Sequence, residues 1–197
     1  MNDKLYYAGT YHHIYNRGTL QTNIFFDEED FNYFLNRLRK FKDKYEIKII
    51  SFCLLNNHFH LFAKQTNDKL KIGKFISDQL NAHTKFMNKK YNRTGVLFEG
   101  PAKTKFVKEK IYYKWIVEYI LLNPVEAKLV DNVTKWKYST ANELIVKDKN
   151  WITSIDELIM IYGSLKNIKK SFEELTTNTV LDKYDFDTDL RRELEEK

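Results

Sequence analysis

The chain has 197 residues, 33 Lys and Arg against 27 Asp and Glu, and one cysteine, Cys53. A hydrophobic content of 43% and an aromatic content of 15% indicate a folded chain with a real core and exclude a disordered one. A lone cysteine excludes an internal disulfide and a cysteine-based zinc site, and with no apolar leader or membrane-spanning run we expect a cytoplasmic protein.

Basic charge is concentrated in the first part of the chain. Residues 151 to 197 carry 7 Lys and Arg against 11 Asp and Glu, which leaves 26 basic and 16 acidic residues in 1 to 150. Residues 69 to 110 alone carry 11 basic and 3 acidic side chains, with aromatic residues between them. Such a stretch can be ordinary solvated surface, but cations for phosphates and rings for unpaired bases are also what binds single-stranded nucleic acid.

The first predicted elements are a strand, a helix and a hairpin. Residues 11 to 16 are aromatic and β-branched and end at Arg17-Gly18, which predicts a strand. Four acidic residues, 27 to 30, open a helix whose apolar side chains recur at helical spacing to about Tyr45. Two apolar strands, 47 to 55 and 58 to 64, follow, with Asn56 and Asn57 as the turn between them.

A second helix, a fourth strand and a third helix complete the predicted domain. The amphipathic segment 70 to 91 predicts the helix, and residues 103 to 107 predict the strand. The next helix starts near residue 108, and we expect Asn123-Pro124 to stop it, because a residue before proline disfavours helical backbone. The order βαββαβ predicts an α+β fold of the ferredoxin-like kind, an antiparallel sheet with helices on one face.

The chain beyond residue 130 predicts only helices. They span about 140 to 146, 154 to 162 and 165 to 175, and a polar tail covers 182 to 197. We therefore predict two parts, a main domain over residues 1 to 146 and a helical C-terminal extension over 147 to 197. The acidic extension is expected to be an accessory, so that truncation near residue 146 leaves a folded domain.

Two histidines on the second strand of the hairpin are the first candidate site residues. His58 and His60 lie two apart, so their side chains point to the same face of the strand. Neutral imidazole is a common metal ligand, and this pair supplies two adjacent ligands but not a complete set. The alternative is a plain pair of histidines on a half-exposed strand.

A second candidate pair lies on the third helix, where Tyr119 and Asn123 are four apart and share one face. If this helix lies against the histidine strand, the Asn123 amide oxygen can complete a metal site with Tyr119 one turn away. Two imidazoles and an amide oxygen suit a loosely held Mg²⁺ or Mn²⁺ better than a structural zinc. Other third ligands stay open, and Tyr119 can also be a simple core residue. The other candidate ligands are Gln79, His83 and His12.

Four ordered segments of the chain resemble the single-tyrosine His-hydrophobic-His transposases, most closely the REP-associated tyrosine transposases. The segments are residues 11 to 18, 57 to 61, 93 to 100 and 119 to 125, and the resemblance spans about 11 to 145. It implies a nuclease domain of ferredoxin-like fold with a divalent metal on His58, His60 and Asn123. It also implies that Tyr119 attacks a phosphodiester of single-stranded DNA, forming a 5′-phosphotyrosine link and freeing a 3′-hydroxyl.

The expected partner is single-stranded or hairpin DNA, and the sequence leaves a homodimer open. The predicted DNA-binding residues are Arg17, Lys85, Lys89, Lys90, Arg93, Lys103 and Lys105. A rival function is a non-catalytic, domesticated DNA-hairpin-binding protein. The intact set of His58, His60, Tyr119 and Asn123 argues against it, and Pro101-Ala102, where relatives often carry arginine and an aromatic residue, keeps it open. A replication initiator or relaxase of the same nuclease type is a third alternative.

Overall fold

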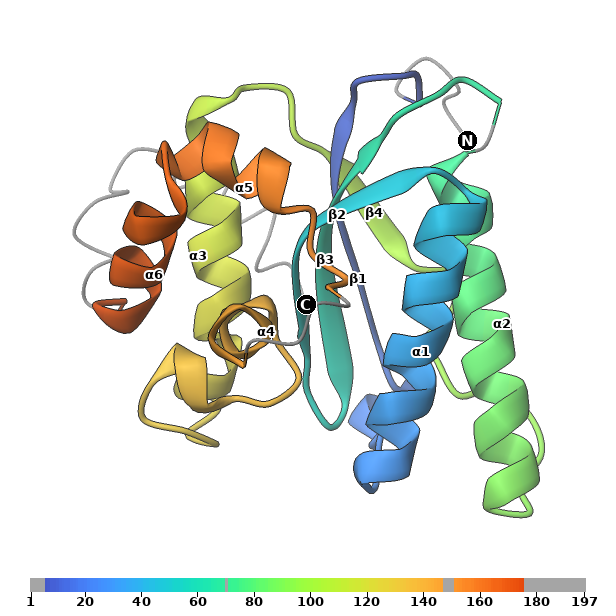
Figure 1. Cartoon of the computed structure of the whole chain (residues 1–197). Helices are drawn as coiled ribbons and strands as arrows, with labels where there is room; N and C mark the ends of the chain where they lie inside the picture. The colour runs from blue at the N-terminus through green and yellow to red at the C-terminus, as the bar shows by residue number, and fades with distance from the viewer. Residues whose placement is uncertain (1–5, 70, 147–150, 176–197) are drawn as a thin grey trace.

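The computed structural model describes residues 6–69, 71–146 and 151–175. The main elements follow the predicted order (Figure 1). They are β1 (Tyr11–Arg17), α1 (Glu28–Lys44), β2 (Ile47–Leu54), β3 (His58–Gln65), α2 (Ile72–Lys90), β4 (Lys103–Phe106), α3 (Ile111–Glu126), α4 (Thr140–Ile145), α5 (Ile155–Tyr162) and α6 (Leu165–Glu173), with short 3₁₀ turns η2 (Thr19–Gln21) and η3 (Val133–Lys135).

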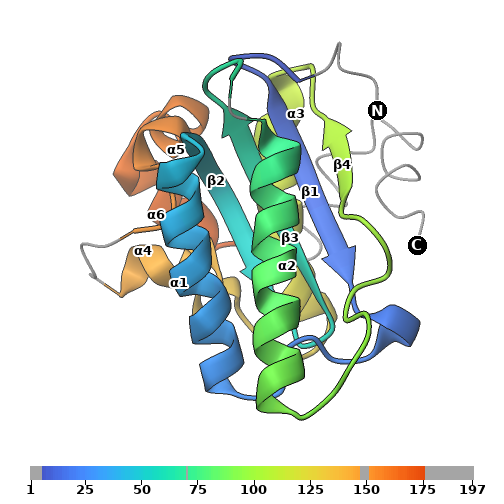
Figure 2. The same cartoon turned by 90° about the vertical axis from the view of Figure 1, so that its right-hand side faces the viewer.

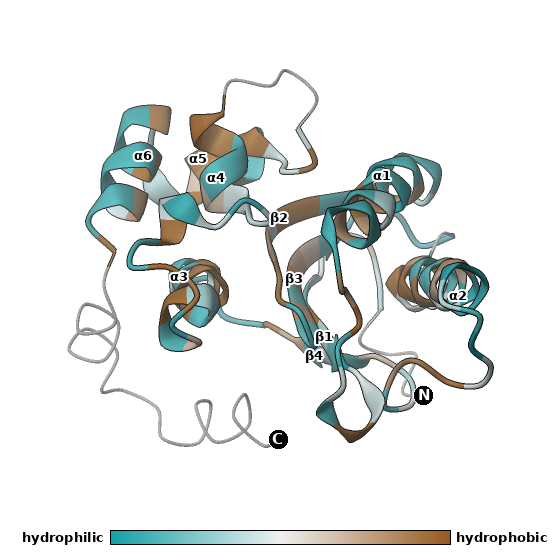
Figure 3. Ribbon diagram, turned by 90° about the horizontal axis from the view of Figure 1, so that it is seen from below, coloured by the Kyte–Doolittle hydropathy of each residue, from teal (hydrophilic) through white to brown (hydrophobic). Residues whose placement is uncertain are grey.

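The strands form one antiparallel sheet in the order β2-β3-β1-β4. This order is the one a ferredoxin-like βαββαβ chain produces, so the predicted fold class is confirmed. Helices α1 and α2 lie side by side on one face of the sheet (Figure 2). Helix α3 and the shorter helices after it lie on the other face, so that the sheet is the middle layer (Figure 3).

Alternation along β3 divides its side chains between two cores. Phe59 and Leu61 are fully buried against residues of α1 and α2. Phe62 is fully buried in a second cluster, formed with α3 and the helices that follow it. Because side chains two apart on a strand share a face, His58 and His60 point with Phe62 toward α3.

Gly18 ends β1 at a point where a side chain does not fit. A Cβ there would lie 2.0 Å from the carbonyl oxygen of Thr22. Gly18 also forms an isolated bridge with Phe98, and the backbone N–H of Glu99 donates to the carbonyl of Arg17 at 2.9 Å. Two of the sequence segments that carry the family resemblance, 11 to 18 and 93 to 100, therefore lie side by side.

The prediction that α3 stops at Asn123-Pro124 is wrong, because the helix continues through Pro124 to Glu126. Proline has no N–H to donate to the carbonyl of Ile120, one helical turn earlier. The side-chain amide of Asn123 takes that place, donating to the Ile120 oxygen at 3.3 Å and to the Tyr119 oxygen at 2.9 Å. The asparagine thus repairs the helix that its neighbouring proline weakens.

The described part of the predicted extension packs closely on the main domain. Leu158, Ile168 and Phe172 are almost fully buried in the core cluster that contains α3. Thr153 forms a parallel bridge with Ile49 of β2. The boundary near residue 146 stays a prediction, and these contacts are a reason to expect that the helices stabilise the domain. Residues 147–150 and the tail from 182 to 197 lie outside the described residues.

Two further sequence expectations concern membranes and Cys53. Among the described residues, no helix is both long enough and apolar enough to cross a membrane. Cys53 is fully buried in β2, and burial raises the pKa of its thiol. A buried, protonated thiol is a poor nucleophile, so Cys53 serves as a core residue.

Candidate active site

The two histidines of β3 lie on the sheet face that α3 covers. Their ring centroids are 5.3 Å apart, and the rings are nearly perpendicular. His60 is buried, whereas His58, at the beginning of the strand, is half-buried. The pair therefore runs from the first residue of β3 into the interface between the sheet and α3.

Helix α3 brings the second candidate pair to the same place. The ring of Tyr119 meets the ring of His60 edge-on, with centroids 5.8 Å apart. One turn further, the side-chain oxygen of Asn123 lies 3.4 Å from Nε2 of His58. The four residues that the sequence predicted as catalytic and metal-binding are thus gathered on one face of the sheet.

Hydrogen bonds fix the orientation of the Asn123 amide. Its nitrogen donates to the carbonyls of Tyr119 and Ile120, so its oxygen is directed toward His58. His58 is oriented in the same way, because its Nδ1 lies 2.7 Å from the side-chain oxygen of Asn57. An amide oxygen only accepts, so Nδ1 of His58 donates to Asn57, and in the neutral imidazole Nε2 then carries the lone pair and faces Asn123.

The donor set fits a divalent cation. Two lone pairs, from His58 Nε2 and Asn123 Oδ1, face each other at 3.4 Å, a contact that repels unless a cation or a proton lies between them. Two ligands at about 2.1 Å from an octahedral ion lie roughly 3 Å apart, so one ion can contact both atoms. Among the described residues, no three His, Cys, Asp or Glu side chains converge on a metal position, and an Asn ligand would supply the missing oxygen.

His60 has a buried partner that the sequence analysis did not identify. Nε2 of His13, on β1, lies 3.0 Å from Nδ1 of His60, and their rings stack with centroids 5.2 Å apart. Burial lowers the pKa of His13 to about 3, and the charge of Lys105 adds to this effect. Burial also lowers the pKa of His60 well below its usual value, helped by His13 and His58. Both imidazoles are therefore neutral at pH 7, as a metal ligand requires.

The alternative third ligands are on the other side of the sheet. Gln79 donates to the carbonyl of Phe34 in α1, and His83 bonds the carbonyl of Ile24 at 2.8 Å. His12 is buried with its Nε2 2.9 Å from the Thr10 hydroxyl. None of the three contacts His58 or His60 in the described structure, which leaves Asn123 as the candidate third ligand.

Three of the predicted DNA-binding residues surround the site face. Lys103 and Lys105 on β4 lie opposite Tyr15 and His13 in the sheet register, so their side chains point to the same face as the histidines. The Lys103 ammonium stands 5.8 Å from the Tyr15 ring centroid. Arg17 lies opposite His58 and forms an ion pair with Glu99.

The other predicted DNA-binding residues lie elsewhere, so their role stays a prediction. Lys85 and Lys89 are exposed on α2, which covers the opposite face of the sheet. Arg93, in the loop after α2, donates to the carbonyl of Val96. Lys90 forms ion pairs with three carboxylates at the beginning of α1, and these would have to break before it could contact a phosphate. Those carboxylates belong to Asp27, Glu29 and Asp30.

Sequence analysis missed His13 and Tyr15 as neighbours of the site. The Tyr15 ring stacks against His60, with centroids 5.7 Å apart, and against His13 at 5.0 Å. The sequence indicated only that His13 and Tyr15, two apart in the first strand, lie on the same face of the sheet. It did not indicate whether that face is the one with His58 and His60. The register that pairs Tyr15 with His60 appears only in the structure.

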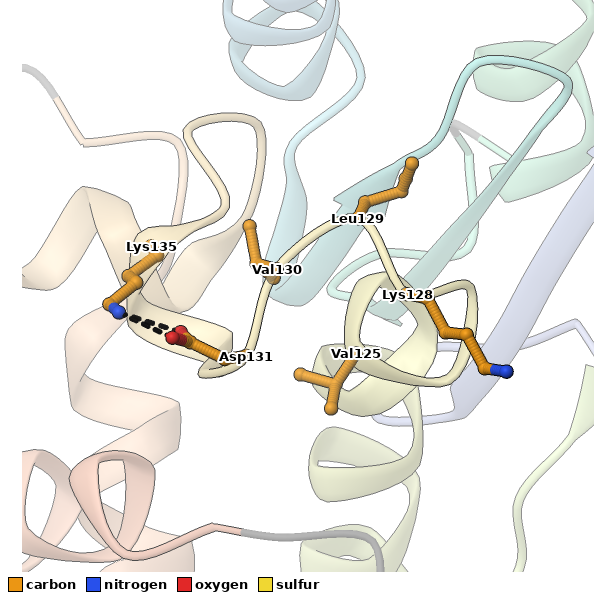
Figure 4. A pocket seen from close by; sticks show the side chains of 6 residues that line it. All are labelled: Val125, Lys128, Leu129, Val130, Asp131 and Lys135. Carbon is orange, nitrogen blue, oxygen red and sulfur yellow. Dashed lines mark hydrogen bonds and ion pairs between the residues drawn. The ribbon is translucent and has the colours of Figure 1, made fainter.

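A surface hollow lies just beyond α3 but does not include the site residues. It lies between the end of α3 and η3 and is lined by Val125, Lys128, Leu129, Val130, Asp131 and Lys135 (Figure 4). Lys135 forms an ion pair with Asp131 across it. Its lining of two lysines, one of them paired with Asp131, two valines and a leucine offers no constellation of groups for covalent chemistry.

Fold and site together define a ferredoxin-like domain with a histidine pair on a central strand and a tyrosine and an asparagine on a facing helix. Residues 6–120, more than half of the chain, match the protein family described as transposase, IS200-like. The chain therefore belongs to the IS200-like transposase family and is a DNA transposase. The matched region contains three of the four site residues, and Asn123 lies just beyond it.

A solved structure of a transposase shares the fold. A REP-associated tyrosine transposase bound to a REP hairpin is 15% identical, with a TM-score of 0.61, covering 76% of this chain and 88% of its own. A candidate transposase from Deinococcus radiodurans R1 is 16% identical, with a TM-score of 0.43, covering 58% and 91%. A comparison with curated protein sequences gives no significant match.

Proposed function

We propose that the protein cleaves and rejoins single-stranded DNA at hairpin-associated sites, with Tyr119 as the nucleophile and a divalent cation held by His58, His60 and Asn123. The observation that carries the proposal is that α3 places Tyr119 and Asn123 against the two histidines of β3. The rings of Tyr119 and His60 meet edge-on with centroids 5.8 Å apart, and the Asn123 oxygen faces His58 at 3.4 Å. The fold of a REP-associated tyrosine transposase that is bound to a REP hairpin supports hairpin DNA as the substrate class.

The proposed reaction exchanges one phosphodiester for another. The Tyr119 oxygen attacks the phosphorus, a bond from this oxygen to phosphorus forms, and the bond to the 3′-oxygen of the DNA breaks. The phenol proton ends, directly or through water, on the released 3′-hydroxyl. A later attack by a 3′-hydroxyl on the phosphotyrosine reverses the exchange, so rejoining requires no external energy source.

A neutral phenol is a weak nucleophile, so the site has to lower the barrier at the phosphate. A divalent cation bound by the two histidines and Asn123 would supply charge stabilisation to the phosphate oxygens. The residues of this chain hold the ligands in place, because Asn57 engages Nδ1 of His58 and the Asn123 amide nitrogen bonds the carbonyls of its own helix. Lys103 and Lys105 add positive charge on the same face.

Tyrosine-to-phenylalanine substitutions test the nucleophile. Tyr119→Phe removes one oxygen and keeps the ring that stacks on Trp115, so folding and hairpin binding should persist while cleavage disappears. The measurement is a denaturing gel of labelled single-stranded hairpin DNA with Mn²⁺, in which a covalent protein adduct moves slowly. The wild-type protein should give this band, and Tyr119→Phe should not.

Tyr112 provides a matched control on the same helix. It lies seven residues before Tyr119, is half-buried like it, and is the nearest alternative nucleophile on that side of α3. Tyr112→Phe should retain the adduct. An adduct that survives in Tyr119→Phe and vanishes in Tyr112→Phe would overturn the assignment. A wild-type protein that binds hairpins but never forms an adduct would establish the non-catalytic binding function instead.

A further inference from the structure

His13 is a fully buried histidine in contact with the site, and the proposed reaction gives it no role. It lies on β1, the neighbour of β3 in the sheet, opposite Phe62 in the register. Its Nε2 is 3.0 Å from Nδ1 of His60, and its ring meets the Tyr119 ring edge-on with centroids 6.0 Å apart. It touches a candidate ligand and the candidate nucleophile at once.

We propose that His13 is the positioning residue of the metal site, accepting a hydrogen bond from Nδ1 of His60 so that Nε2 of His60 is presented to the cation. The inference rests on the proposed metal site and extends it to a residue outside the ligand set. His13 does for the buried ligand what Asn57 does for the half-buried one. Asn57 accepts from Nδ1 of His58 at 2.7 Å and directs its Nε2 toward Asn123.

The proton arrangement follows from what each ring nitrogen can do. A neutral imidazole has one N–H and one lone pair, and a metal takes the lone pair. If Nε2 of His60 binds the cation, its proton must be on Nδ1, and His13 Nε2 is the acceptor within reach. His13 then carries its own proton on Nδ1, a buried atom without a hydrogen-bond partner in the described structure.

The unpaired Nδ1 of His13 argues that this histidine does more than fill space in the core. A histidine that only fills space would gain by replacing a buried polar nitrogen with carbon, since an unpaired buried N–H is unfavourable. The residue at this position is nevertheless a histidine, and its Nε2 contacts Nδ1 of His60. The arrangement is therefore understandable if the acceptor at Nε2 is what the site requires.

Two substitutions at His13 and one at His12 form the test, with Mn²⁺ affinity measured by titration calorimetry. His13→Phe keeps an aromatic ring but has no acceptor, and it should weaken Mn²⁺ binding by about 10–100-fold. His13→Gln can place an amide oxygen near the position of Nε2 and should restore affinity to within a few-fold of wild type. His12→Phe is the matched control, because His12 is equally buried in the same strand but faces the other side of the sheet.

A spectroscopic measurement tests the hydrogen bond between His60 and His13 directly and requires neither Mn²⁺ nor DNA cleavage. In ¹⁵N spectra of the imidazoles with saturating Mg²⁺, which is diamagnetic, His60 should be protonated at Nδ1 and His13 should be unprotonated at Nε2. The reverse assignment would overturn the proposal. So would wild-type affinity in His13→Phe, or an equal loss in His13→Phe and His13→Gln, which would indicate packing alone.

These outcomes are distinct from a failure of the proposed function. If wild-type protein binds Mn²⁺ and His13→Phe does not, while no DNA adduct ever forms, the positioning role stands and the nuclease fails. If wild type forms the adduct and His13→Phe binds Mn²⁺ normally, the nuclease stands and the positioning role fails. A wild-type protein that binds neither Mn²⁺ nor Mg²⁺ removes the metal site and overturns both.

Discussion

At the scale of single residues, local rules predicted that the four candidate site residues form two pairs, each on one face, and the family resemblance supplied their expected roles. A spacing of two on a strand and a spacing of four on a helix each place side chains on one face. His13 could not be predicted, because its role depends on which strands are neighbours and on a register that pairs Tyr15 with His60. Long-range pairing of this kind leaves no local trace in the sequence.

Charge reversal separates lysines that face the site from lysines that do not. We expect Lys103→Glu with Lys105→Glu to weaken hairpin binding at any DNA sequence, because both side chains share the site face. The slope of log affinity against log salt should become shallower by roughly 1.4 to 1.8, since each of the two lost phosphate contacts contributes about 0.7 to 0.9. Binding would be measured by fluorescence anisotropy at several salt concentrations.

The matched control is Lys85→Glu with Lys89→Glu, which makes the same change of charge on α2. These side chains are exposed on α2, which covers the opposite face of the sheet, so a smaller effect on affinity and slope is expected. If the α2 pair proves the more damaging, the DNA crosses the α1 and α2 face, and the site face is not the main binding surface.

At the scale of elements, α3 continues past the proline at which the sequence predicted that it would stop. The sequence predicted the beginning of the helix and its apolar character, but the proline rule considers the backbone alone. The helix continues because a side chain, the Asn123 amide, bonds the carbonyl that Pro124 leaves unpaired. One amide group thus completes the helix with its nitrogen and faces His58 with its oxygen.

A double-mutant cycle between Asn123 and Pro124 tests this account. Asn123→Ala should lower the free energy of unfolding by about 1–3 kcal/mol, because it leaves the buried Ile120 carbonyl without a donor. In a Pro124→Ala background the restored backbone N–H can bond that carbonyl, so the same substitution should cost about 1 kcal/mol less. Urea unfolding of the four proteins gives the coupling energy. Costs that agree within about 0.5 kcal/mol would mean that the two residues act independently.

At the scale of the whole molecule, α5 is tied to the sheet by a buried carboxylate. Glu157 is 2% exposed and accepts hydrogen bonds from the Tyr11 hydroxyl at 2.8 Å, from Lys64 at 2.9 Å and from Lys48 at 3.2 Å. Burial raises its pKa, but the bonds from Lys64, Tyr11 and Lys48 outweigh burial, and the pKa is lowered overall. A charge excess in the sequence suggested an accessory, and that stays a prediction; this cluster is a reason to expect that α5 stabilises the fold.

The lowered pKa of Glu157 predicts how stability depends on pH. An unfolded glutamate titrates near pH ~4.3, so the stabilisation is complete above about pH 5 and is lost as the pH falls through the lower folded value. Glu157→Gln should therefore lower the Tm at pH 7 by about 2–4 °C for each kcal/mol lost. The difference from wild type should shrink below about pH 4.

Thermal melts monitored by circular dichroism between pH 3 and 8 provide the measurement. Glu173→Gln is the matched control, because its side chain is exposed on α6, and it should follow wild type at every pH. A Glu157→Gln deficit that stays constant down to pH 3 would show that the charge of Glu157 is not what holds α5.

The division of the site between β3 and α3 has a consequence for how activity can be lost. The separation between nucleophile and ligands is not set within either element, but by how the helix rests on the sheet. Leu158, Ile168 and Phe172 support the outer side of that helix from residues that come after it in the chain. A survey of inactivating substitutions should accordingly include buried apolar positions far from the bound DNA. The packing of these apolar side chains sets the position of α3, and with it the distance between Tyr119 and the candidate ligands.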